Sequence, residues 1–108
     1  MSRVQQISPR ELVALRRTDN PPVCVDVRTG GEYEIASIEN TLHIPMHEIA
    51  DRLDELDPTQ HVVVICHHGI RSMRVALYLE HCGFERLSNL AGGIEAWSID
   101  VDAQVPRY

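Results

Sequence analysis

Residues 62–72 read Val-Val-Val-Ile-Cys-His-His-Gly-Ile-Arg-Ser, and this stretch decides the fold of the 108-residue chain. Its four β-branched apolar residues in succession predict a buried strand. A helix is predicted over residues 72–82, because apolar residues recur on one of its faces, and Gly83 is placed to end it. A buried strand followed by a short loop and a helix is typical of a βαβ unit.

The remaining elements alternate in the same way. Strands are expected over residues 23–27, 42–44 and 86–90, and helices over residues 9–17, 32–37 and 48–56, with a last short helix after Gly92-Gly93. Ser8, Pro9 and Glu11 form a capping box at the start of the first helix. Strands separated by helices imply a mainly parallel sheet. Residues 1–108 are therefore expected to form one α/β domain, with a central sheet of about five strands and helices on both faces.

Composition limits the classes of function. The net charge is −6, and the ten basic residues are all arginines scattered along the chain, which argues against a nucleic-acid partner. The longest apolar run, residues 62–66, is too short to cross a membrane. The first residues lack the apolar stretch of a signal peptide, so a cytoplasmic location is expected. Three cysteines without a CxxC pair indicate thiols rather than a disulfide framework.

The loop after the central strand carries the chemistry, since reactive groups in parallel sheets gather beyond the carboxyl ends of the strands. Cys66 closes the strand and faces a helix N-terminus, where partial positive charge and unpaired N–H groups favour the thiolate. Gly69 lets the loop adopt a positive φ angle. Arg71 adds a permanent charge that can grip a sulfonate or a similar anion, and Ser72 can cap the helix. Cys66 is thus expected to be the nucleophile.

The loop resembles the active-site loop of the rhodanese family of sulfurtransferases, in which Cys-x-x-Gly-x-Arg-Ser follows a central strand. Further matching segments keep the family's order and spacing over residues 23–98: Asp26-Val27-Arg28, Glu32-Tyr33, His43-Ile44-Pro45, Gly83-Phe84, Asn89-Leu90 and the run Gly-Gly-Ile-Glu-Ala-Trp at 92–97. One segment departs from the pattern. Residues 36–41 read Ala-Ser-Ile-Glu-Asn-Thr where the family often has Gly-His-Ile-x-Gly-Ala, at a place away from the sulfur loop.

The resemblance implies a two-step sulfur transfer without a metal or an organic cofactor. The thiolate of Cys66 would take the outer sulfur of thiosulfate or another persulfide donor and become a persulfide. Cyanide, a small thiol or a protein thiol would then remove that sulfur. The resemblance also implies that the active-site loop binds the substrate, with Arg71 as the anion contact; this loop comprises His67, His68, Gly69, Ile70, Arg71 and Ser72. Asp26 and Arg28 are expected to pair near its base as a support.

Metal binding at the loop is not expected, because adjacent side chains on a tight loop diverge and no second ligand pair follows at the usual spacing. His67 and His68 are expected to rim the pocket, and a direct contact with substrate stays open. Cys24 is expected to pack as a small apolar residue, and Cys82 in the core or near the surface. A resolving role for either cysteine also stays open.

Two other functions compete with sulfur transfer. Cysteine phosphatases and arsenate reductases resemble this loop but place five residues between cysteine and arginine, whereas four separate Cys66 from Arg71. The shorter loop offers a smaller cradle that suits a single terminal sulfur. A non-catalytic module that carries or senses persulfide while docked on a separate partner protein needs the same loop, and it remains the alternative.

Overall fold

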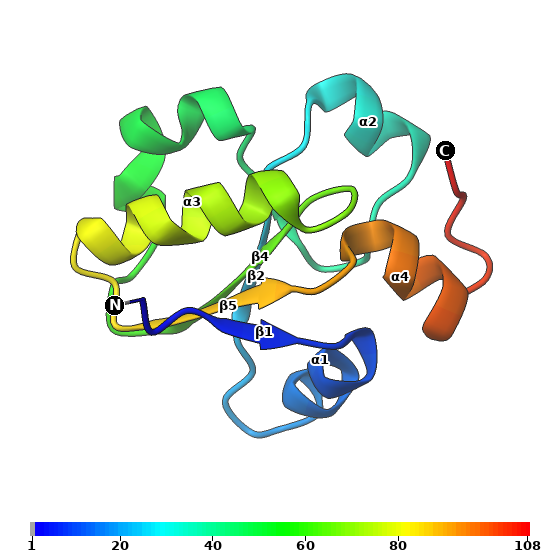
Figure 1. The fold of residues 1–108 in the computed structure, drawn as a ribbon, viewed down its shortest axis with the longest axis horizontal. Helices are drawn as coiled ribbons and strands as arrows, with labels where there is room; N and C mark the ends of the chain where they lie inside the picture. The colour runs from blue at the N-terminus through cyan, green and yellow to red at the C-terminus, as the bar shows by residue number, and fades with distance from the viewer. Residues whose placement is uncertain (1) are drawn as a thin grey trace.

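The computed structural model describes residues 2–108 and is built on one five-stranded sheet, in which every strand pair is parallel (Figure 1). The strand order is β1-β5-β4-β2-β3. The strands are β1 (Gln5–Ile7), β2 (Val23–Asp26), β3 (Leu42–His43), β4 (His61–Ile65) and β5 (Arg86–Leu90). The helices are α1 (Pro9–Arg16), α2 (Gly30–Ile35), the 3-10 helix η1 (Met46–Glu55), α3 (Ile70–His81) and α4 (Gly93–Asp100).

Helices cover both faces of the sheet, as the sequence predicts. Because successive strand residues point to opposite faces, β4 contributes to two separate cores. Val62 and Val64 pack in a core with side chains of η1 and α3. Val63 and Ile65 pack in the other core with side chains of α1 and α4. The prediction of a single α/β domain with a mainly parallel sheet is therefore confirmed. None of the helices within residues 2–108 combines the length and the apolar character that a membrane span requires.

Helix boundaries differ from the prediction where a cap was overlooked. The α1 capping box of Ser8 and Glu11 is present. A second capping box, formed by Thr29 and Glu32, starts α2 at Gly30 rather than at residue 32. In α3, Gly69 is the N-cap with a φ angle of 95°, so the helix begins at residue 70 instead of 72. The predicted role of Ser72 as a helix cap is therefore wrong.

Two elements differ in kind from the prediction. Strand β1 was not predicted, because it is a three-residue edge strand of which only Ile7 is buried. The segment expected to be an α-helix over 48–56 is instead the 3-10 helix η1, which is interrupted at Arg52. Neither difference alters the carboxyl edge of the sheet, where β4 passes into the loop that carries Cys66.

Candidate active site

Cys66 directly follows β4, and only 1% of its surface is exposed. Two hydrogen-bond donors point at its sulfur. The N–H of Gly69 lies 3.1 Å from Sγ, and the hydroxyl of Ser72 lies 3.2 Å from it. Donors of this kind stabilise negative charge on sulfur. The loop therefore curls around Cys66 in a way that suits a thiolate or the outer, charged sulfur of a persulfide.

The start of helix α4 fixes the first residues of the loop. The N–H of Ile94 donates to the carbonyl oxygen of Cys66 at 2.9 Å, and the N–H of Glu95 donates to that of His67 at 3.2 Å. Gly93 makes this approach possible, because a Cβ atom there would overlap both carbonyl oxygens. Its φ angle of 62° lies in the left-handed region that favours glycine. The first free N–H groups of α4 thus hold the loop that leads into the preceding helix, α3.

Strand β5 supports the loop through the buried side chain of Asn89. Its amide nitrogen donates to the carbonyl oxygen of Gly69 at 3.0 Å and to Gln6 Oε1 at 2.9 Å. Its side-chain oxygen accepts a hydrogen bond from the hydroxyl of Ser72. Asn89 was noted in the sequence only as part of a matching segment. Its contact with the donor to the Cys66 sulfur could not be read from its position in the chain.

The guanidinium of Arg71 is paired with the carboxylate of Glu32, a partner that the sequence pattern does not indicate. Arg71 Nη1 lies 2.6 Å from Glu32 Oε1, and Nη2 lies 2.8 Å from Oε2. Hydrogen bonds from Arg71 hold the pKa of Glu32 well below its usual range, and Glu32 in turn raises the pKa of Arg71. The role of Arg71 as an anion contact stays a prediction. Its guanidinium is already paired with Glu32, so an anion would have to bind beside this pair or displace the carboxylate.

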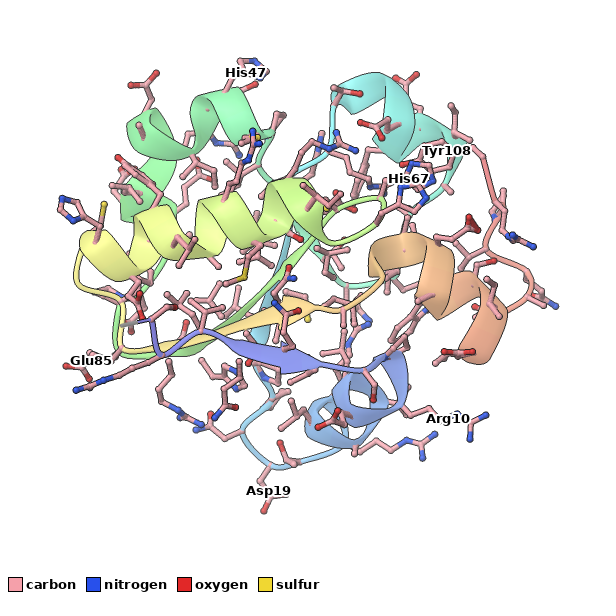
Figure 2. All side chains as sticks on the ribbon, viewed as in Figure 1. Arg10, Asp19, His47, His67, Glu85 and Tyr108 are labelled. Atoms are coloured by element: carbon pink, nitrogen blue, oxygen red, sulfur yellow. The ribbon has the colours of Figure 1, made fainter. Side chains whose placement is uncertain are left out.

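Tyr108 extends this group from the far end of the chain (Figure 2). Its hydroxyl donates to Glu32 Oε2 at 2.8 Å and accepts a hydrogen bond from Arg28 Nη1, also at 2.8 Å. Its ring stacks on the imidazole of His67, with 3.9 Å between the centroids. Burial raises the pKa of Tyr108. Nothing in the local sequence pattern indicated that this tyrosine reaches the loop.

The expected pair of Asp26 and Arg28 is present, and both side chains are fully buried. Arg28 Nη2 lies 2.7 Å from Asp26 Oδ2, and Arg28 Nε lies 3.0 Å from Oδ1. Arg28 Nη2 also donates to the carbonyl oxygen of Ala36 at 2.7 Å. Through Tyr108 and Glu32, the buried pair is connected to Arg71 in the active-site loop.

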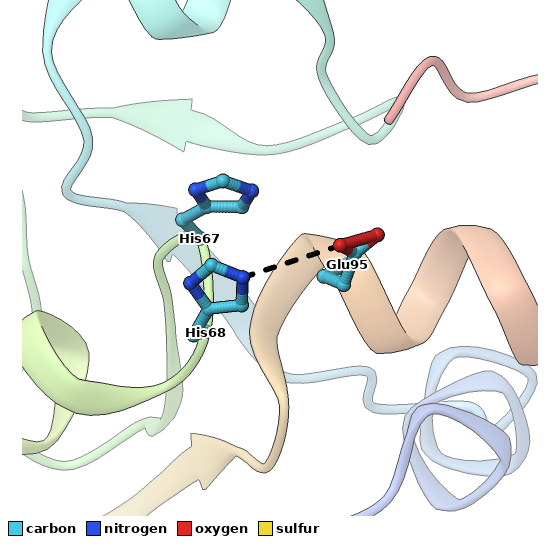
Figure 3. A group of neighbouring side chains, drawn as sticks. All are labelled: His67, His68 and Glu95. Carbon is cyan, nitrogen blue, oxygen red and sulfur yellow. Dashed lines mark ion pairs between the residues drawn. The ribbon is translucent and has the colours of Figure 1, made fainter. Parts of the chain in front are cut away.

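The side chains of His67 and His68 do not diverge, so the geometric reason for dismissing a metal was wrong. Their rings stack with centroids 3.9 Å apart, and Glu95 lies 4.0 Å from the ring of His68 (Figure 3). Donor atoms of the three residues come within 4.8 Å of one another. Imidazole and carboxylate groups suit Zn²⁺ as ligands. The two stacked rings, however, direct their lone pairs along nearly parallel planes instead of toward one ion. Glu95 is also paired with Arg107. The predicted absence of a metal remains a prediction.

The other two cysteines lie away from this network. Cys24 is buried in β2, and burial raises the pKa of its thiol. Cys82 is exposed at the end of α3, so it does not belong to the core.

Burial lowers the pKa of His67, which favours the neutral imidazole at this position of the loop.

Comparison with known proteins identifies the family. The model of the rhodanese-like domain matches residues 8–100. The thiosulfate sulfurtransferase GlpE of Pseudomonas syringae pv. syringae is 36% identical, with 90% of each chain covered. The rhodanese-like/PpiC domain-containing protein 12 of Arabidopsis thaliana is 38% identical over 78% of this chain, which spans only 29% of that protein's length.

A solved structure shares the whole fold. The rhodanese-like domain protein from Staphylococcus aureus superimposes with a TM-score of 0.84 at 31% identity, covering 97% of this chain and 99% of that one. The family match over residues 8–100 includes strands β2 to β5, the helices of both layers and the loop around Cys66. On this evidence the chain belongs to the family of rhodanese-like domains.

Proposed function

We propose that the protein is a sulfurtransferase that carries the transferred sulfur as a persulfide on Cys66. The observation that supports this most directly is the pair of donors at the Cys66 sulfur, from Gly69 and Ser72. Relatives about 35% identical along most of their length are named thiosulfate sulfurtransferase, which favours the same chemistry here. The net charge of −6 favours small sulfur compounds or thiols as partners over nucleic acid.

The proposed reaction has two displacements at sulfur. The Cys66 thiolate attacks the outer sulfur of the donor, a new S–S bond forms, and the donor's own S–S bond breaks. The electron pair of that bond leaves with sulfite when the donor is thiosulfate, or with a thiolate when it is a persulfide. Cyanide or a thiol then attacks the outer sulfur and releases the Cys66 thiolate, so no oxidant or cofactor is consumed. Gly69 and Ser72 stabilise the negative charge on sulfur at each stage.

Burial of Cys66 favours sulfur over phosphate as the transferred group. With 1% of the residue exposed, the nucleophile accepts a narrow terminal atom more easily than a tetrahedral phosphate. The loop has four residues between Cys66 and Arg71, one fewer than in the phosphatases. The non-catalytic persulfide carrier is the second candidate, because it needs the same donors around the same sulfur.

The test is the intact mass of the protein after brief exposure to thiosulfate, and separately to a small-thiol persulfide. We expect the parent to gain one sulfur atom, to lose it on addition of cyanide or a thiol, and to keep this behaviour in Cys24→Ala and Cys82→Ala. The Cys66→Ala variant should gain nothing. A gain in that variant would assign the chemistry to another cysteine, and no gain in the parent from any donor would overturn the proposal. If the protein takes up one sulfur atom on Cys66 but does not turn over repeatedly, the non-catalytic persulfide carrier is favoured.

A further inference from the structure

Glu32 is held beside Arg71 from three directions. Both carboxylate oxygens bind the guanidinium of Arg71, at 2.6 and 2.8 Å. Oε1 also accepts the N–H of Thr29 at 3.2 Å in the capping box of α2, and Oε2 accepts the hydroxyl of Tyr108 at 2.8 Å. Only 20% of the Glu32 side chain is exposed. A substrate anion would therefore have to compete with a well-anchored carboxylate for the same cation.

The pairing changes what the active-site loop offers to a donor. Arg71 is the one cation within the loop itself, and its two terminal nitrogens face Glu32. The nearby Arg28 is neutralised in the same way by Asp26. An incoming dianion meets a neutral ion pair instead of a free positive charge, which would attract a dianion about twice as strongly as a monoanion.

We infer that Glu32 determines donor specificity: by occupying Arg71 it disfavours donors with two negative charges, such as thiosulfate, and favours singly charged sulfane-sulfur donors, such as thiol persulfides and thiosulfonates. This inference rests on the proposed function, because it concerns which donor loads Cys66. Glu32 acts through Arg71 and is a specificity-determining residue rather than a participant in the sulfur displacement.

Two donors of nearly equal shape isolate the effect of charge. Thiosulfate and the methanethiosulfonate anion present the same terminal sulfur, but a methyl group in the second replaces one charged oxygen of the first. The Cys66 thiolate forms its S–S bond with that sulfur in both cases. The donor's S–S bond breaks, and the electron pair leaves with sulfite from thiosulfate or with methanesulfinate from methanethiosulfonate. Neither reaction requires a further reactant.

The experiment measures kcat/KM for both donors at a fixed concentration of cyanide in the parent and in Glu32→Gln. Glutamine keeps the oxygen that closes the capping box, so α2 should form normally. We expect Glu32→Gln to raise kcat/KM for thiosulfate about tenfold, and that for methanethiosulfonate by less than about threefold. The matched control is Glu34→Gln, an exposed carboxylate on the same helix that makes no ion pair within residues 2–108, and it should leave the ratio unchanged.

A double-mutant cycle establishes whether the effect passes through Arg71. In the Arg71→Gln background, the Glu32→Gln substitution should no longer raise the thiosulfate rate. An unchanged or reduced thiosulfate-to-methanethiosulfonate ratio in Glu32→Gln overturns the inference, as does an equal change in Glu34→Gln. In these cases Cys66 still takes up sulfur and the proposed function stands. If neither donor loads Cys66 in the parent, the proposed function fails and the inference fails with it.

Discussion

Ser72 and Asn89 hydrogen-bond to each other directly beside the sulfur of Cys66. The Ser72 hydroxyl has one proton and two acceptors in reach, the Cys66 sulfur and the Asn89 side-chain oxygen, so it donates to one of them at a time. A thiolate is the stronger acceptor of the two because it carries a full charge. The charge on the sulfur therefore influences whether Ser72 donates to Cys66 or to Asn89, the residue through which β5 supports the loop.

The first prediction concerns this hydroxyl. Ser72→Ala removes one of the two donors to the sulfur, which is worth about 1.5–3 kcal/mol when the acceptor is charged. We expect the rate of Cys66 loading to fall at least about tenfold, and Ser72→Thr to retain most of it. Alkylation of Cys66 by iodoacetamide at neutral pH should slow in parallel, because negative charge on the sulfur is then stabilised by one donor fewer. An alkylation rate equal to that of the parent would assign Ser72 a role in the loop's shape alone.

The second prediction concerns the close approach of α4 to the loop. Gly93→Ala would place a Cβ atom against the carbonyl oxygens of Cys66 and His67 and would impose a left-handed φ angle on alanine. We expect the free energy of unfolding to fall by about 2–4 kcal/mol in urea denaturation. Gly83→Ala is the control, because its φ angle is also positive but nothing lies within 4 Å of the added atom. Equal losses of unfolding free energy in the two variants would show that the overlap with the carbonyl oxygens of the loop does not destabilise the fold.

Strong local signals explain why much of the fold could be predicted from the sequence. The apolar residues of β4, the apolar face of α3 and the glycines around them are each encoded within about ten neighbouring positions. Cys66 is predicted to be the nucleophile because its loop joins a buried strand to a helix start. In contrast, β1 has two exposed residues out of three and pairs with β5, more than eighty positions away. Its pairing partner, not its own pattern, makes it a strand.

The polar network around the loop could not be predicted for a related reason. Arg71 and Glu32 lie 39 positions apart, and Tyr108 lies 76 positions from Glu32. Each residue has many partners of suitable charge in a chain with 16 acidic and 10 basic residues. Only the packing of α2 and the C-terminal segment against the same end of the sheet selects these pairs. The sequence can thus indicate a charged residue in such a loop while its partner, and hence the net charge of the pair, stays hidden.

The third prediction concerns the buried pair. Asp26→Asn keeps the shape of the side chain but leaves the guanidinium of Arg28 buried without its counter-charge. Breaking a buried pair in this way costs about 3–5 kcal/mol, and we expect a loss of that size in urea denaturation. Glu48→Gln provides the comparison, since it removes one carboxylate from a partly exposed pair with Arg52 and should leave the unfolding midpoint close to that of the parent. Similar midpoints for the two variants would contradict the prediction.

The fourth prediction concerns metal ions at His67, His68 and Glu95. Because the two rings are stacked and Glu95 is paired with Arg107, we expect the chemistry at Cys66 to proceed without a bound metal. Prolonged dialysis against a chelator should leave the loading of Cys66 unchanged, and elemental analysis of the purified protein should find no stoichiometric metal. Loss of loading that Zn²⁺ restores in the parent but not in His68→Ala would contradict this prediction.

The last prediction concerns pH and the pair of Glu32 and Arg71. Arg71 holds the pKa of Glu32 well below its ordinary value of 4.5 in the folded state. A depressed carboxyl pKa stabilises the fold above the unfolded value, and that contribution is lost progressively as the pH falls from the unfolded pKa to the folded pKa. The stability difference between the parent and Glu32→Gln should therefore be constant above about pH 5 and shrink below it.

Donor selectivity should follow the same rule, because the carboxylate and the guanidinium both stay charged wherever activity can be measured. The pKa of Arg71 is raised by Glu32, so the upper limit lies in strong base. We expect the effect of Glu32→Gln on the thiosulfate-to-methanethiosulfonate ratio to be flat from about pH 5 to about pH 9, because neither charge of the pair changes in that range. The prediction is contradicted if the ratio of the parent approaches that of Glu32→Gln between about pH 5 and about pH 6. Glu32 would then take up a proton in this range, and Arg71 would not keep its carboxylate charged as the geometry indicates.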